Sequence, residues 1–197
     1  MPSSAEEDFD NILFEGRTRP SQQKPVALAE PAPRPEGEAL AADDVKEIFS
    51  LRGKFQAAAK KHRVPEEVLE GMASRESRAG KALNAEGYDP EKKAWGIMQI
   101  DERYHTVDKT GGPDSQEHID QSAGILREYR DFVAKKHPHW TEDEKWRGAV
   151  AAYNMGPGNV KTREHMDAGT TGGDYSEDVM TRARIFRERM RQRSKRK

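Results

Sequence analysis

The carboxyl group of Glu76 is the side chain in this sequence best placed for acid–base chemistry. It lies in the segment 73–80, ASRESRAG, where a helical pattern runs into a glycine. The carbonyl end of a helix carries partial negative charge, which disfavours a carboxylate and raises its pKa. A general acid working near neutral pH needs such a raised pKa. The same segment also permits a surface glutamate paired with Arg75 or Arg78.

A second segment with polar side chains of interest is 95–101, WGIMQID. It is rich in apolar residues, bounded by polar loops and too short for a helix of its own. With a period of two, Met98 and Ile100 face one way, whereas Ile97, Gln99 and Asp101 face the other. The pattern predicts a strand whose polar face forms one wall of a cleft. An edge strand with a solvated polar face is the alternative.

Helical periodicity predicts at least five helices around these two segments. Asp43 or Asp44 is expected to cap the first, and Pro65 to open the second, from whose last turn Glu76 projects. Capping residues mark the other three. These are Ser115 for a helix ended by His137 and Pro138, Thr141 with Glu144 for a helix ended by Gly156 and Pro157, and Asp174 with Glu177 for the last.

Length and composition favour one domain with tails. The chain has 197 residues, 34% hydrophobic and 35% charged, with a mean hydropathy of -1.04, so part of it is expected to be solvated. Residues 1–40, rich in proline and acidic residues, are predicted to be a disordered or loosely docked arm. Residues 41–189 form the predicted domain, and 190–197 a basic tail that is either solvated or a contact for an anionic partner.

Several classes of function are disfavoured by what the sequence lacks. There is no cysteine, which excludes disulfides, thiol catalysis and thiolate metal sites. The histidines show no metal-ligand spacing, so we expect no metal and no cofactor. A net charge of -1 provides no overall field for nucleic acid, and no run approaches the ~20 apolar residues that span a membrane. No secretory signal is visible at the acidic start.

Taken in order, four segments carry a family resemblance. They are SRESRAG at 74–80, WGIMQID at 95–101 followed by Arg103 and His105, GAVAAYN at 148–154, and MDAGTT at 166–171 followed by Asp174 and Tyr175. Their order and spacing resemble goose-type lysozymes, which share a glycoside hydrolase family with lytic transglycosylases. The resemblance covers roughly residues 43–186. It implies a lysozyme-like α+β fold, mostly helical, in a single domain with a small β element.

The resemblance implies hydrolysis of the β-1,4 bond between N-acetylmuramic acid and N-acetylglucosamine in peptidoglycan. Glu76 matches the family's catalytic acid. Asp101 matches the aspartate that ends the family's Met-Gln-Val-Asp strand and holds the attacking water. Family members invert the sugar's configuration, which requires carboxyl groups ~6.5 to 9.5 Å apart. From the residues alone, Asp101 also reads as a strand-end cap that binds Arg103.

The chain departs from the family pattern in the loop before the strand. Family members usually have Gly-Trp-Gly-Asp and then a Gly-Asn pair, whereas residues 87–93 read GYDPEKK and the spacing is about one residue longer. Asp89 is the nearest match to a second water-holding aspartate, with its register off by one. Glu91 is a weaker substitute.

Five further residues match family positions that line the sugar-binding cleft. Amide and imidazole groups suit N-acetyl and hydroxyl groups, and aromatic faces suit sugar rings. Tyr153 could also steady charge in the transition state, while the alternative leaves its hydroxyl at the surface. The five are Gln99, His105, Tyr153, Asn154 and Tyr175.

Rival functions remain open at this stage. They are a lytic transglycosylase that forms 1,6-anhydro products and a peptidoglycan-binding immune protein without activity. The resemblance implies bacterial peptidoglycan as the partner, a proteinaceous lysozyme inhibitor as a further partner, and a monomer. The family is commonly extracellular, yet this chain is more similar to fish members without cysteine or a visible signal, which leaves the cytoplasm and non-classical export open. Residues 9–12, FDNI, faintly match an amino-terminal family segment.

Overall fold

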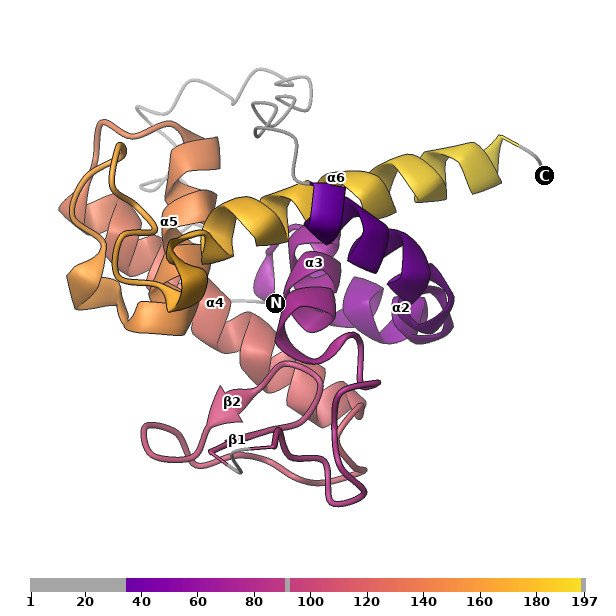
Figure 1. Cartoon of the computed structure of the whole chain (residues 1–197). Helices are drawn as coiled ribbons and strands as arrows, with labels where there is room; N and C mark the ends of the chain where they lie inside the picture. Colours follow the sequence, from indigo (N-terminus) through magenta and orange to yellow (C-terminus); the bar gives the residue numbers. More distant parts are fainter. Residues whose placement is uncertain (1–34, 91–92, 196–197) are drawn as a thin grey trace, which may run out of the picture.

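The computed structural model describes residues 35–90 and 93–195 (Figure 1). Helices dominate, and one small antiparallel pair of strands completes the described part, which confirms the predicted fold class. The elements are α2 (Pro35–His62), α3 (Glu66–Ser77), β1 (Ala94–Trp95), β2 (Ile100–Asp101), α4 (Gln116–Lys136), α5 (Glu142–Met155), the 3₁₀ turns η1 (Pro157–Asn159) and η2 (Thr171–Gly173), and α6 (Tyr175–Ser194).

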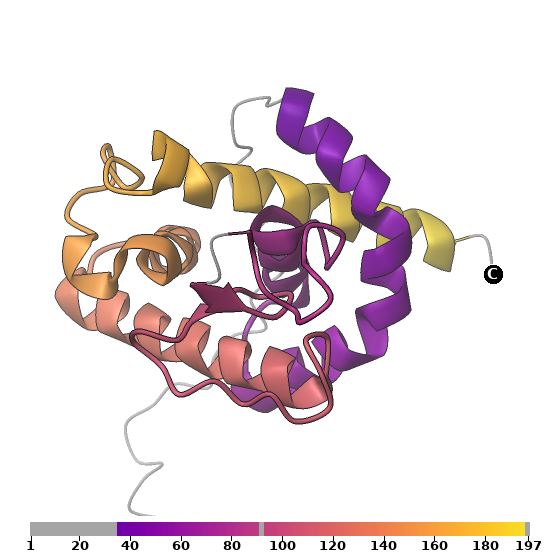
Figure 2. The same ribbon diagram turned by 60° about the horizontal axis from the view of Figure 1, so that its bottom comes forward.

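Helix α3, which carries Glu76, is the central helix. Figure 2 shows it in the middle of a frame made by α2, α4, α5 and α6, and its residues 68–74 are all buried. Gly71 allows α3 to approach α6 very closely, because a Cβ there would lie 2.5 Å from the Val179 carbonyl oxygen and 3.3 Å from the Ala183 Cβ. This contact fixes the position of α3, and hence of Glu76, against α6.

Two clusters of buried apolar side chains hold the helices together. Their burial supplies the main stabilising free energy of the fold. The larger cluster joins α2, α3, α4 and α6 and includes Ile48, Phe55, Leu69, Met72, Ile119, Leu126 and Phe186. The smaller one lies between α4, α5 and the segment after η1 and comprises Val133, Trp140, Ala151, Ala152, Val160 and Met166.

Helix α2 begins at Pro35, so the predicted cap at Asp43 or Asp44 is wrong. Asp44 is fully buried inside the helix, where its carboxylate accepts hydrogen bonds from the Ser74 hydroxyl at 2.7 Å and the Arg78 guanidinium at 2.9 Å. These partners lie far along the chain, so the local sequence does not reveal them. Without them, Asp44 resembles a helix cap. Residues 36–40, which were predicted to belong to the amino-terminal arm, are part of α2. Residues 190–194, from the predicted basic tail, are part of α6. The segment 9–12 lies outside the described residues.

The capping signals at Ser115 and Thr141 predicted two helix starts correctly. The Ser115 side chain accepts from the His118 backbone N–H at 3.2 Å. Thr141 and Glu144 form the predicted capping box, with bonds of 3.2 and 2.7 Å. Helix α4 ends at Lys136, directly before His137 and Pro138, as expected.

The capping box predicted at Asp174 and Glu177 does not form. The Asp174 carboxylate pairs instead with the guanidinium of Arg75 at 3.2 Å. Asp167 takes over the start of α6, because its carboxylate accepts from the backbone N–H groups of Ser176 at 2.8 Å and Glu177 at 3.2 Å. A carboxylate at a helix amino terminus is favourable, so Asp167 caps α6 from outside the helix.

Residues 95–101 form a tight hairpin, and the prediction of one continuous strand is wrong. Strands β1 and β2 pair through a turn at 96–99, and the apolar residues on both sides of it are buried. Gly96 has φ +78°, and a Cβ there would lie 2.2 Å from the His118 ring. His118 in turn accepts from the Met98 backbone N–H at 3.2 Å. The period-two reading failed because this short apolar run is buried on every side.

Candidate active site

Glu76 lies in the last turn of α3 as a partly buried carboxyl group. The Tyr175 hydroxyl, at the start of α6, donates a hydrogen bond to Glu76 Oε1. Burial raises the pKa of Glu76 to about 7, against the opposing effects of the Tyr175 hydrogen bond and the Arg75 charge, and the charge of Asp89 raises it further. Glu76 therefore keeps its proton in a large fraction of molecules near neutral pH.

The two arginines beside Glu76 in the sequence are directed to other carboxylates. Arg75 binds Asp178 at 2.9 Å and Asp174 at 3.2 Å, both near the start of α6. Arg78 is directed towards Asp43 and Asp44 on α2. The surface pairing of Glu76 that the local sequence also permitted is thus replaced by ion pairs between α3 and its neighbouring helices.

Asp174→Asn should lower the pKa of Glu76 by roughly half a unit. The substitution removes one of two carboxylates that compensate Arg75, whose positive charge favours the ionised form of Glu76. A carbon-13 NMR titration of the Glu76 carboxyl group measures the change. Asp131→Asn, which breaks the ion pairs of Asp131 with Arg127 and Arg130 on α4, is the matched control and should leave the pKa of Glu76 unchanged. An unchanged or higher pKa in Asp174→Asn would contradict the role given to this pair.

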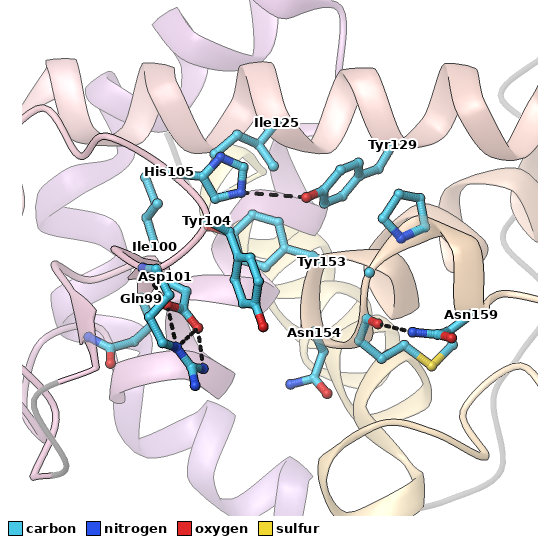
Figure 3. Close-up of a pocket in the computed structure, with 14 residues that line it drawn as sticks. Gln99, Ile100, Asp101, Tyr104, His105, Ile125, Tyr129, Tyr153, Asn154 and Asn159 are labelled. Carbon is cyan, nitrogen blue, oxygen red and sulfur yellow. Dashed lines mark hydrogen bonds and ion pairs between the residues drawn. The ribbon is translucent and has the colours of Figure 1, made fainter.

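A cavity of about 570 Å³ is lined in part by Tyr153 (Figure 3), whereas Glu76 itself is not one of its lining residues. Tyr153 links the two, because it lines the cavity and its pKa is raised by burial and by the charge of Glu76. The lining combines aromatic rings with amide, imidazole and carboxylate groups. It consists of Gln99, Ile100, Asp101, Arg103, Tyr104, His105, Ile125, Tyr129, Tyr153, Asn154, Met155, Gly156, Pro157 and Asn159.

Four residues matched to the sugar-binding wall do line this cavity: Gln99, His105, Tyr153 and Asn154. Hydrogen bonds hold them in place. The Gln99 amide nitrogen donates to the Gly96 carbonyl at 2.7 Å. The Tyr153 hydroxyl is not free at the surface, since it donates to the Met98 carbonyl at 2.9 Å. This bond ties α5 to the hairpin.

Asn154 and His105 are held from other directions. The side-chain oxygen of Asn154 accepts from the Thr171 backbone N–H at 2.8 Å, which leaves the amide nitrogen as a donor. The His105 ring faces the Tyr129 hydroxyl of α4 (Figure 3), with 3.5 Å between its Nε2 and that oxygen. The cavity wall is therefore assembled from the hairpin, α4, α5 and the segment before η2.

Tyr175 occupies a different place from the other matched residues. Its side chain is buried, and it is not one of the residues that line the cavity. Its described polar contact is the hydrogen bond to Glu76, and burial together with the Glu76 charge raises its own pKa. Tyr175 thus acts on the acid, as a fixed hydroxyl donor.

Asp101 lines the cavity and is held by Arg103. Its carboxylate accepts from the Arg103 backbone N–H at 2.8 Å and from the same residue's guanidinium, the pairing that the sequence offered as an alternative. The side-chain hydrogen bond from Arg103 is the largest cause that lowers the Asp101 pKa, so this group is ionised near neutral pH.

Asp89 is close enough to Glu76 for its negative charge to raise the pKa of that acid. Its carboxylate accepts from the backbone N–H groups of Lys93 at 3.1 Å and Ala94 at 3.4 Å, so it also fixes the entry to β1. Glu91, the weaker substitute, lies outside the described residues.

Sequence reasoning missed several cavity residues. Tyr104 is 77% exposed and stands at the cavity in Figure 3, in a polar loop with nothing to bury it. An unburied aromatic next to a matched His105 was an available signal. Tyr129, on α4, follows the apolar periodicity of that helix and was interpreted only as a buried residue, and Ile125, one helical turn before it, was not singled out. Met155 and Asn159 also went unrecognised.

Two features are absent from residues 35–90 and 93–195. No three His, Asp or Glu side chains come together there in a way that could hold a metal ion. None of the helices in these ranges is both long and apolar enough to cross a membrane.

Comparison with known proteins agrees with the site. The family model described as lysozyme g matches residues 35–190. Lysozyme g of Casuarius casuarius is 37% identical over 150 residues, covering 76% of this chain and 79% of that protein. Lysozyme g of Cyprinus carpio is 36% identical over 150 residues (76% and 80%), and that of Takifugu rubripes 38% over 158 residues (77% and 81%). The chain therefore belongs to the lysozyme g family of glycoside hydrolases.

Proposed function

We propose that this enzyme hydrolyses the β-1,4 bond between N-acetylmuramic acid and N-acetylglucosamine in bacterial peptidoglycan, as part of antibacterial defence. The observation that carries the proposal is Glu76, a partly buried carboxyl group with a pKa of about 7 next to a polar, aromatic cavity. The relatives of this chain that are named lysozyme g support the same function.

In the proposed mechanism, protonated Glu76 donates its proton to the glycosidic oxygen as the bond to the leaving sugar breaks. Such proton transfer lowers the barrier most when the acid's pKa lies near the working pH. A pKa of about 7 meets this condition. The Tyr175 hydroxyl keeps the carboxyl group oriented, and it stabilises the carboxylate left after the transfer.

A second carboxylate is needed to activate the attacking water on the opposite face of the sugar. Asp101 and Asp89 are the two candidates, the first because it is ionised on the cavity wall and the second because its charge reaches Glu76. We propose inversion of configuration, in which water fits between acid and base carboxyl groups ~6.5 to 9.5 Å apart.

The cavity wall is suited to N-acetylated sugars. The cavity volume of about 570 Å³ lies in the usual range for small-ligand sites. The amide nitrogen of Asn154 is available for an acetyl carbonyl, and the exposed ring of Tyr104 offers an apolar face to a sugar ring. We propose Gln99, His105, Tyr153 and Asn154 as substrate-binding residues.

One observation favours a second candidate, a lytic transglycosylase. That reaction uses the same acid, but the muramic acid's own hydroxyl attacks, so no carboxylate need hold a water. The Asp101 carboxylate is bound by both the backbone and the guanidinium of Arg103, which occupies oxygens that would otherwise orient water.

Mass spectrometry of fragments released from purified peptidoglycan decides between these functions. Hydrolysis should add one water per bond cleaved, and proton NMR should show the α anomer first. Fragments with a 1,6-anhydro end, one water lighter, would replace the hydrolase with the transglycosylase. Binding without any released fragment would leave a recognition protein.

A further inference from the structure

A second cavity, of about 680 Å³, adjoins the first. The two share a wall made of Met155 and Asn159. The sulfur of Met155 packs towards Gly169 of the second cavity, where a Cβ would lie only 2.9 Å from it, so the Met155 side chain contributes to the walls of both cavities. A polymer seated in the first cavity therefore passes directly beside the second. The second is lined by Met155, Asn159, Lys161, Thr162, His165, Ala168 and Gly169.

The wall of this second cavity is more apolar than polar, and its polar side chains include a lysine but no acidic residue. Within the described part of the chain, the Lys161 ammonium has neither an ion-pair nor a hydrogen-bond partner. The Thr162 side-chain oxygen accepts from the His165 backbone N–H at 3.2 Å, which leaves its O–H as a donor. Ammonium, hydroxyl and imidazole donors in one place suit a carboxylate ligand.

We propose that the second cavity binds the peptide stem of peptidoglycan through its carboxylate groups, with Lys161 as the contact. This inference rests on the proposed function. The stem branches from the muramic acid through a lactyl group and carries free carboxylates, whereas the glycan itself is neutral. A glycan in the first cavity would project stems from its edge, and the adjoining cavity offers both the room and the opposite charge.

Three soluble ligands distinguish the source of the carboxylate. They are a neutral N-acetylglucosamine oligomer, a glycan freed of stems by an amidase, which keeps the lactyl carboxylate, and a glycan with intact stems. Binding is measured by calorimetry in the Glu76→Gln background, so that the ligands stay whole. Lys161→Glu and Lys161→Gln are compared with Lys60→Glu, an exposed lysine on α2 outside both cavities.

Lys161→Glu should weaken binding of the stem-bearing glycan by roughly 3- to 10-fold, because an exposed ion pair is lost and repulsion takes its place. Lys161→Gln should have a smaller effect in the same direction. Binding of the neutral oligomer should be unchanged in both variants, and Lys60→Glu should bind all three ligands normally.

Other outcomes overturn the proposal in distinguishable ways. Weakening confined to the stem-free glycan would assign Lys161 to the lactyl carboxylate, which is free only after the amidase has cut its amide bond to the stem. Equal weakening for both glycans would show that Lys161 has no preference for the stem. An unchanged affinity for the stem-bearing glycan, or an equal loss for the neutral oligomer, would remove the stem site while the proposed function stands. If the Glu76→Gln protein that retains Lys161 binds none of the three ligands, both the stem site and the proposed function are overturned.

Discussion

Glu76→Gln is expected to slow bacterial wall lysis by roughly 10² to 10⁴-fold. The amide has the size of the carboxyl group but no acidic proton, so the glycosidic oxygen would leave unprotonated. The Tyr175 hydroxyl can donate to the amide oxygen as it does to Glu76 Oε1, so the fold should be kept. The clearing rate of a suspension of bacterial walls measures activity, and circular dichroism with thermal melting checks the fold.

The pH dependence of the wild-type rate provides an independent measurement. Glu76 must be protonated to act, so the rate should fall as the pH rises through about 7. Glu128→Gln, an exposed carboxylate on α4, is the control and should clear walls normally. In the same assay, Asp101→Asn and Asp89→Asn identify the general base. Removal of the carboxylate that activates the water should cause the larger loss of clearing rate. Wild-type clearing by Glu76→Gln would remove the assigned acid.

Glu70→Gln is expected to stabilise the protein by about 2 to 3 kcal/mol at pH 7. Glu70 is 1% exposed in the middle of α3, and its Oε1 has no hydrogen-bond partner in the described structure. Burial raises its pKa to about 8, and the charges of Glu66 and Glu67 on the same helix add to this. Glutamine keeps the shape and removes the ionisation.

The sign follows from the unfolded chain, in which Glu70 has its ordinary pKa of 4.5. Since the folded pKa is higher, the contribution of Glu70 to the unfolding free energy, taken as the difference between wild type and Glu70→Gln, should be most favourable below pH 4.5 and decline as the pH rises to about 8. Urea unfolding across this range measures it, with Glu188→Gln on α6 as the exposed control. An equally steep pH dependence in Glu70→Gln would show that Glu70 is not its source.

The parts of the fold that the sequence predicted depend on neighbouring residues. Ser115 caps α4, and Thr141 and Glu144 cap α5, through bonds that span three positions of the chain. Pro65 precedes α3, and His137 follows α4, because their effects on the backbone are equally local. Signals that involve residues only a few positions apart can be recognised directly in the sequence.

The incorrect capping predictions involve acidic residues whose partners are distant in the sequence. Asp44 and Asp174 both look like helix caps, yet Asp44 binds Arg78 and Asp174 binds Arg75. Neither arginine is near its carboxylate along the chain. Asp167 shows the reverse, because it caps a helix from which it is separated by η2.

The site residues show the same contrast between features set by neighbouring residues and features set by distant contacts. Glu76 was identified from its helix end, but the structure attributes its raised pKa mainly to burial, which depends on the tertiary packing. Gln99 and Asp101 were predicted to form a cleft wall and do line the cavity, although they lie in a hairpin and not in one continuous strand. Tyr129 was missed because a helical apolar stripe does not separate core from cavity.

The close contact at Gly71 restricts how this enzyme could be redesigned. Glu76 at the end of α3 meets Tyr175 at the start of α6, and the spacing of these helices is set where Gly71 faces Val179 and Ala183. Gln99 and Asn154 border the cavity, but their side chains also bind the Gly96 carbonyl and the Thr171 backbone N–H, so a designer who changes them for new sugar specificity must replace these hydrogen bonds. Position 71 is more restricted still. A larger residue there would need compensating changes on α6, so the alignment of the acid with its hydroxyl donor depends on a residue that has no side chain.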